Sequence, residues 1–169
     1  GTKKTFRLAI TGGLGILIWV APALGKSWRG ITPLRSTRAD VERLLGAPEP
    51  GTQALYRDKE DVVRVTYAKI QCDYGWRVQP NTVISLTIQP KVPLKLIDLK
   101  LNEKRFEKRR DLSLENVYYY LSETEGINYT VDSPAGVVTS IEYYPMKRDR
   151  RLKCALKPKP KGRTLASIS

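Results

Sequence analysis

The sequence contains no histidine and only two cysteines, and both facts limit the chemistry that the chain can perform. Without histidine there is no Ser-His-Asp triad, no histidine general base and no imidazole ligand for a metal. Two cysteines alone cannot form a four-ligand zinc site. Acidic residues are also scarce: 17 stand against 30 Lys and Arg, and the net charge is +13. We therefore expect a protein that is not an enzyme and that carries no cofactor and no metal.

The residues that are present suffice for one folded domain. Hydrophobic residues make up 41% of the 169 residues, which excludes general disorder. The length leaves little room for a second full domain. We expect three regions: residues 1–25 as a signal peptide or retained membrane anchor, residues 26–156 as an exported domain, and residues 157–169 as a basic, proline-rich tail. All 17 acidic residues lie in the middle region, so both ends are purely basic.

An apolar run without any charge extends over residues 8–24. It follows a basic start with Lys3, Lys4 and Arg7, and small residues precede Lys26. A basic start, an apolar stretch and a small-residue cleavage site are typical of a secretory signal peptide. We therefore expect the chain to be exported, to a periplasmic or cell-surface location.

The same run also fits a retained membrane anchor. As a helix it would rise about 26 Å, close to the thickness of about 30 Å of a bilayer core. In this alternative Leu8, Ile16 and Trp19 belong to the membrane anchor, with Trp19 and Trp28 near one membrane face. Both alternatives predict an N-terminal hydrophobic helix, and they differ only in whether it is cleaved.

The C-terminal region alternates lysine with proline at Lys157, Lys159 and Lys161. Such a stretch favours an extended polyproline conformation and cannot pack a core. We expect these residues to be disordered or bound to a partner.

The clearest local signal is a short helix that ends near Leu45. Ser36 or Thr37 can serve as its N-cap, and an apolar stripe at helical spacing follows. Gly46 ends the helix, and Pro48 prevents its continuation.

Apolar and alternating segments predict strands at residues 53–57, 62–68, 82–89, 117–122, 127–131 and 137–144. Short turns join the last three, which predicts an antiparallel meander. Residues 94–101 fit either a helix or a strand, and the preceding Pro93 favours a short helix. Residues 104–110 are expected to be a solvated basic connection.

These elements predict the α+β class: small antiparallel sheets with one or two short helices. The two halves resemble each other, because each begins with Pro-Leu, offers a helix and three strands, and ends at a proline. A duplicated unit of one helix and three strands and two unrelated runs both remain open at this point.

Cys72 and Cys154 form an even pair in a chain that we expect to be exported. Oxidising compartments favour disulfides, so these residues are predicted to be bonded to each other. Two free buried thiols are the alternative.

Basic residues gather in two further stretches, and either could contact an acidic partner. The candidate contact residues are Lys104, Arg105, Arg109, Arg110, Arg150, Arg151, Lys157, Lys159 and Lys161, with Lys147, Arg148 and Lys153 in the same stretches. Acidic residues are interleaved and no nucleic-acid-binding motif is present, so we expect no nucleic-acid partner. Solvated faces or docking to an acidic protein or acidic lipid head groups are favoured instead.

Two sets of residues resemble known families. Gly30-Ile31-Thr32-Pro33-Leu34, Ser36-Thr37, Asp40-Val41, Leu44-Leu45-Gly46 and Pro48 resemble the opening of SmpA/OmlA (BamE-like) envelope proteins. Tyr67, Cys72, Gly75-Trp76, Val83-Ile84, Gly126-Ile127, Tyr143-Tyr144-Pro145, Asp149 and Leu152-Lys153-Cys154 resemble a group of uncharacterised bacterial exported proteins. The resemblance implies a small α+β module that binds other proteins. Lys26 stands where the BamE-like pattern has its lipid-bearing cysteine.

Taken together, these features predict a non-catalytic extracytoplasmic protein-interaction module. It would serve as an accessory or scaffold subunit of a membrane or envelope complex, with other proteins and the membrane as partners. The alternative is a freely secreted soluble binder or inhibitor that is released by signal cleavage.

Overall fold

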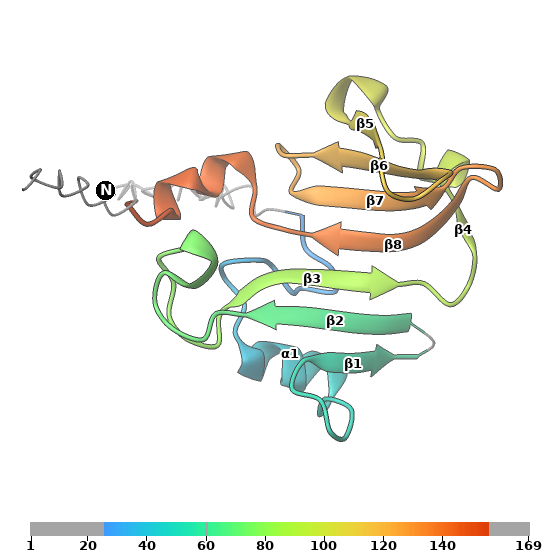
Figure 1. Cartoon of the computed structure of the whole chain (residues 1–169). Helices are drawn as coiled ribbons and strands as arrows, with labels where there is room; N and C mark the ends of the chain where they lie inside the picture. The colour runs from blue at the N-terminus through green and yellow to red at the C-terminus, as the bar shows by residue number, and fades with distance from the viewer. Residues whose placement is uncertain (1–25, 60, 156–169) are drawn as a thin grey trace, which may run out of the picture.

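The computed structural model describes residues 26–59 and 61–155 and folds them around one antiparallel sheet (Figure 1). The sheet has eight strands in the order β1-β2-β3-β8-β7-β6-β5, and β4 pairs with β8 beside this path. The strands are β1 (Leu55–Asp58), β2 (Asp61–Tyr67), β3 (Val83–Gln89), β4 (Leu94–Lys95), β5 (Glu107–Arg110), β6 (Val117–Ser122), β7 (Ile127–Asp132) and β8 (Val137–Tyr143). The described helices are α1 (Arg38–Leu45) and the short 3₁₀ helices η1 (Asp73–Gly75), η2 (Leu96–Leu99), η3 (Glu103–Arg105) and η4 (Lys147–Leu152).

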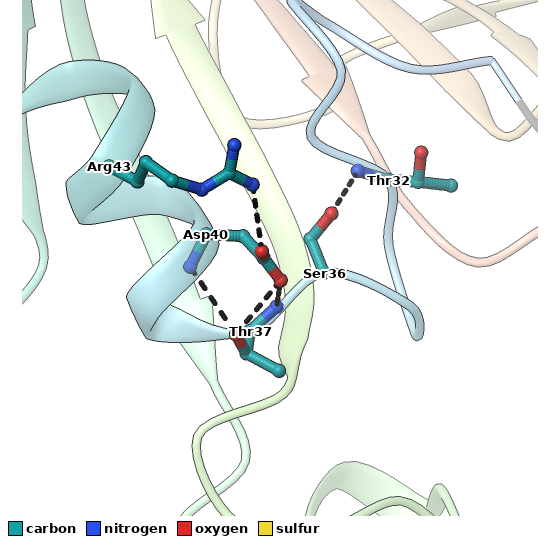
Figure 2. A network of polar contacts seen from close by, with 5 residues as sticks. All are labelled: Thr32, Ser36, Thr37, Asp40 and Arg43. Carbon is teal, nitrogen blue, oxygen red and sulfur yellow. Dashed lines mark hydrogen bonds and ion pairs between the residues drawn. The ribbon is translucent and has the colours of Figure 1, made fainter.

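Helix α1 begins where the sequence predicts it, with Thr37 as the N-cap (Figure 2). The backbone N–H of Asp40 donates to the Thr37 hydroxyl over 3.3 Å, and the backbone N–H of Thr37 donates to the Asp40 carboxylate over 2.9 Å. The bonds that the Thr37 N–H and the Thr37 hydroxyl donate to the Asp40 carboxylate, each over 2.9 Å, lower the pKa of Asp40, and so does Arg43 at 3.0 Å. The reciprocal cap satisfies backbone donors that a helix start leaves free.

One face of the sheet carries most of the core, and α1 covers part of it (Figure 1). Val41 of α1 packs on Val63 and Val65 of β2 and on Leu86 of β3. On β7 and β8 a second cluster continues on the same face, and Ile141 and Tyr143 contact both clusters. The second cluster is built from Ile127, Tyr129, Val131 and Val138. We call this face the helix-side face.

The opposite face has a smaller apolar cluster near one end of the sheet. Leu34, Ala68 and Ile84 form it, and Trp76 and Leu152 pack against it. Period-two alternation along the strands accounts for the difference between the two faces, because successive side chains point to opposite sides.

The α+β prediction with small separate sheets is wrong, because the described residues form one eight-stranded antiparallel sheet with a single short α-helix. The duplicated unit is also absent from these residues. Strand β3 pairs with β8 at Leu86↔Tyr143 and Ile88↔Ile141, which joins the two halves into one sheet. Five strands, and not three, follow the short connection after β3.

Two local predictions also need correction. Residues 94–101 form the two-residue strand β4 followed by η2, because Leu94 pairs with Val138 and the N–H of Leu96 donates to the Gly136 carbonyl over 2.9 Å. The expected connection at residues 104–110 contains η3 and the edge strand β5. Strand β5 forms through backbone pairing with β6, although none of its side chains is buried.

The predicted N-terminal hydrophobic helix, including Leu8, Ile16 and Trp19, lies outside the described residues, and so does the tail with Lys157, Lys159 and Lys161. Within residues 26–59 and 61–155, no helix is long and apolar enough to cross a membrane.

Candidate functional site

Basic side chains from four segments meet at one end of the sheet, where β6 turns into β7 and η4 lies (orange-red in Figure 1). We call this surface the basic end. It consists of Lys26, Lys104, Arg105, Lys147, Arg148, Arg150, Arg151 and Lys153, all of them exposed. Both boundaries of the described domain, Lys26 and Ala155, also lie here, as the contacts below establish.

Helix η4 is held in place by the buried Asp149, which is 1% exposed. One oxygen of its carboxylate accepts from the Arg35 guanidinium over 3.2 Å, and the other accepts from the Met146 backbone N–H over 2.9 Å. Because Asp149 points inward, its charge is neutralised by Arg35 inside the domain. The remaining charged residues of η4 are all cations and are directed outward.

The residues that follow η4 are attached to the loop around η1. Cys154 is bonded to Cys72, with 5.8 Å between their Cα atoms, so the predicted disulfide is present. The N–H of Cys154 also donates to the Gly75 carbonyl over 3.0 Å. The Lys153 ammonium lies 5.4 Å from the centre of the Trp76 ring, a cation–π contact. These contacts place the exit toward residue 156 beside the basic end.

The β6–β7 turn supplies the acidic residues that organise this surface. Glu123 pairs with Arg150 over 2.9 Å, and Glu125 pairs with Arg105 over 3.1 Å and with Lys26. These pairs connect η3, η4 and the start of the domain to a single turn. The Arg150–Glu123 pair is exposed on both sides and contributes little stability, whereas the Glu125 side chain is only 10% exposed, and both glutamates fix where the cationic segments lie.

Several cations of the basic end have no acidic partner. In the described part of the chain, no ion pair joins Lys147, Arg148 or Arg151 to a carboxylate. Lys147 lines a hollow of about 500 Å³ together with Lys104 and Arg105. The basic end therefore combines a net positive charge with a concave surface, which suits an anionic partner.

Tyr144 adds a hydroxyl donor beside these cations, in a shallow hollow that it shares with Arg150 and Lys153. Burial, and then the charge of Glu123, raises the pKa of Tyr144 to about 12. The phenol therefore stays protonated at neutral pH and can donate to an anion.

The other predicted contact residues of the described part, Arg109 and Arg110, lie on β5 and differ in position. Arg109 is held by Glu107 through two bonds of 2.8 and 2.9 Å. This pairing lowers the pKa of Glu107 and raises that of Arg109, and Glu123 and Tyr144 at the basic end also raise the pKa of Arg109. Arg110 is paired with Tyr118 in the β5–β6 register, toward the opposite end of the sheet. Of the sequence-predicted contacts, Lys104, Arg105, Arg150 and Arg151 are therefore brought together, Arg109 borders them, and Arg110 is separate.

The other groups with perturbed acidity are explained by burial and by local hydrogen bonds, such as the bond that the Tyr119 hydroxyl donates to the Asp111 carboxylate, which lowers the pKa of Asp111 and raises that of Tyr119. Burial raises the pKa of Glu142, and an Asn128 hydrogen bond opposes it. Burial, reinforced by the 2.8 Å contact with the Tyr56 hydroxyl, raises the pKa of Tyr67. Among residues 26–59 and 61–155, no group of three or more His, Cys, Asp or Glu residues could hold a metal ion.

Sequence reasoning missed Lys26, Glu123 and Glu125 as parts of this site. Glu123 lies 27 positions from Arg150, and Glu125 lies 20 positions from Arg105 and 99 from Lys26, so no local motif marks these pairs. The short turn between the two predicted strands at residues 117–122 and 127–131 could have indicated them, because it fixes where these two carboxylates lie relative to the sheet.

Comparisons with known proteins give little further information. No family model matches the chain, and no curated protein matches it. Among solved structures, a DUF4309 family protein (YjgB) from Bacillus subtilis is similar, with a TM-score of 0.48 and 13% sequence identity. The similarity covers 69% of this chain and 83% of that chain, and it is too low to carry an argument.

The resemblance to SmpA/OmlA (BamE-like) proteins is wrong. No family model matches the chain. The eight-stranded sheet is not a BamE-like fold. The motif that suggested it covers residues 30–48, and a capped helix of eight residues followed by Gly is a local solution that unrelated folds share.

Proposed function

We propose that this chain is a non-catalytic extracytoplasmic interaction module, held with its basic end against an acidic membrane surface. In this position it serves as an accessory subunit of a membrane or envelope complex. The observation that carries the proposal is the coincidence at one end of the sheet: the unpaired cations of η4 lie beside both points where the chain leaves the described domain.

The sequence on either side of the domain supports this orientation. The uncharged apolar run at residues 8–24 stands directly before Lys26, and a Lys-Pro stretch follows Ala155. A membrane-inserted run that ends two residues before Lys26 would bring the basic end to the lipid head groups. Each Lys or Arg near an anionic bilayer contributes on the order of 1 kcal/mol, and the effect fades within about 10 Å.

The disulfide supports the extracytoplasmic location, because such bonds persist mainly in oxidising compartments. The basic residues after the apolar run would favour the cytoplasmic side by the positive-inside rule. However, folded domains cross membranes largely regardless of their charge, so the disulfide has the greater weight.

The test is vesicle binding by a chain that starts at Lys26. We expect it to bind vesicles with about 30% phosphatidylglycerol and not pure phosphatidylcholine, and to be released by salt. A triple variant, Lys147→Glu, Arg148→Glu and Arg151→Glu, should weaken binding by roughly two orders of magnitude.

The matched control reverses three exposed cations that do not belong to the basic end. Lys95→Glu, Lys100→Glu and Lys108→Glu change the net charge by the same amount, and all three residues are exposed. Equal loss of binding in both triple variants would contradict the proposal, because it would show a response to net charge alone. Recovery of the mature protein as a soluble chain that lacks residues 1–25 would favour the secreted binder instead.

A further inference from the structure

A second hollow lies on the helix-side face, and Phe106 lines both this hollow and the one at the basic end. The segment from β4 to Phe106 covers β7 and β8 on this face, with Leu94, Leu96 and Leu99 packed on the second core cluster. This segment does not extend over β5 and β6. A groove of about 770 Å³ lies between the segment and these two strands, within the range of about 300–1,000 Å³ that is usual for ligand sites.

The inner surface of this groove is apolar and aromatic. Leu96, Leu101, Phe106 and Tyr120 line it, all partly buried. The Phe106 ring packs on Tyr129 with 5.8 Å between ring centres, which fixes its orientation against the sheet. Ile97 stands at the rim with 81% of its side chain exposed, an unusual position for a large apolar residue.

Three lysines border the groove: Lys95, Lys100 and Lys108. The Lys108 ammonium lies 4.3 Å from the centre of the Tyr118 ring and 5.6 Å from that of Tyr120. Lys100 has a left-handed backbone with φ of 47°, an uncommon conformation for a residue other than glycine. Within the described ranges no ion pair joins any of the three to a carboxylate, although Glu103 also lines the groove.

We propose that this groove binds a single-chain amphipathic carboxylate, such as a medium-chain fatty acid. The alkyl chain lies against Leu101, Phe106 and Tyr120, and the carboxylate meets the Lys100 and Lys108 ammonium groups. Burial of the chain supplies the affinity, and the lysines select an anionic head group.

The backbone around the groove favours an alkyl ligand over an acidic peptide. An extended peptide needs backbone hydrogen-bond partners, as in strand addition. Here β6 is paired on both sides, with β5 and with β7, so its N–H and C=O groups are already used in the plane of the sheet. The groove therefore offers side chains, and an alkyl chain requires nothing else.

The test uses the full chain in phosphatidylcholine nanodiscs and a dodecanoic acid that carries a photoreactive diazirine. After irradiation and digestion, mass spectrometry locates the crosslinks. We expect saturable labelling of peptides that contain residues 96–106 and Tyr120, competed by unlabelled dodecanoate. The diazirine alcohol of the same length should label these peptides at least tenfold less.

The variant Lys100→Glu/Lys108→Glu should reduce labelling by the acid at least tenfold, and both substitutions are on exposed side chains. The control Arg64→Glu/Lys69→Glu, at two exposed residues on and just after β2, should leave the labelling unchanged. Equal labelling by acid and alcohol, labelling that does not saturate, or an unchanged Lys100→Glu/Lys108→Glu variant would each overturn the proposal. Displacement of the probe by an acidic peptide but not by dodecanoate would also overturn it and indicate a peptide site.

Discussion

Removing the disulfide between Cys72 and Cys154 should lower the free energy of unfolding without changing the fold. The bond closes a chain segment of 82 positions, for which the loop-entropy relation gives about 4.5 kcal/mol as an upper value. The folded state of the variant retains the backbone contacts around the disulfide. These include the antiparallel β-bridge between Trp76 and Lys153 and the hydrogen bond of 2.7 Å that the Arg77 N–H donates to the Leu152 carbonyl. The effect therefore arises mainly in the unfolded chain, which gains freedom when the crosslink is absent.

The assay is urea denaturation of the oxidised protein and of the double variant Cys72→Ser/Cys154→Ser. Serine at both positions avoids a free thiol. It also has a Cβ, as cysteine does, so the backbone strain at Cys72, where φ is 66°, is the same in both proteins. With an m value of about 2 kcal/mol per molar urea, the midpoint should fall by about 2 M. For a domain whose total stability is about 5–15 kcal/mol this is a large fraction. A loss below about 1 kcal/mol would refute the reasoning, because it would mean that the unfolded chain already holds these segments together.

Three further predictions concern single positions. Gly126→Ala should lower the free energy of unfolding by about 3 kcal/mol or more in urea denaturation, because φ is +66° and a Cβ would clash with the Tyr144 carbonyl oxygen. Gly136→Ala, at φ +60° with nothing within 4 Å of the added Cβ, should cost only about 1–2 kcal/mol. Asp149→Asn should cost about 2 kcal/mol in the same assay, since it removes a buried charge-assisted bond, and an unchanged midpoint would show that Asp149 does not anchor η4. Burial raises the pKa of Glu142, so its ionisation opposes folding, and stability is lost as the pH rises through the folded-state pKa. Glu142→Gln should therefore raise the thermal midpoint at pH 7, with the gain vanishing near pH 4, and a gain that is the same at both pH values would contradict the assigned cause.

Local signals account for the elements that the sequence predicts correctly. Thr37, an apolar stripe and Gly46 determine α1 through bonds that span only a few residues. The β6–β7 and β7–β8 hairpins follow from apolar strands joined by short turns, with Gly126 and Gly136 at positive φ. In each case the stabilising contacts lie close together in the sequence, so a short window contains the information.

Long-range pairing accounts for the errors. The β3–β8 register joins residues more than 50 positions apart, and no local pattern distinguishes one sheet from two. Strand β5 has the sequence Glu-Lys-Arg-Arg, which resembles a solvated connection. It becomes a strand because the edge of β6 offers unpaired backbone groups, and charged residues are suited to an exposed edge.

The sequence by itself determined the charge of the chain, the absence of histidine chemistry, the apolar run at residues 8–24 and the cysteine pair. Only the tertiary structure decided which cations act together. It placed Arg105 and Arg150 around the β6–β7 turn, placed Arg110 toward the opposite end of the sheet, and left an apolar groove beside Lys100 and Lys108. The physical reason is that charge and composition are sums over the residues, whereas a site depends on the distances between side chains in the folded protein. In this protein, pairing between strands remote in the sequence sets those distances.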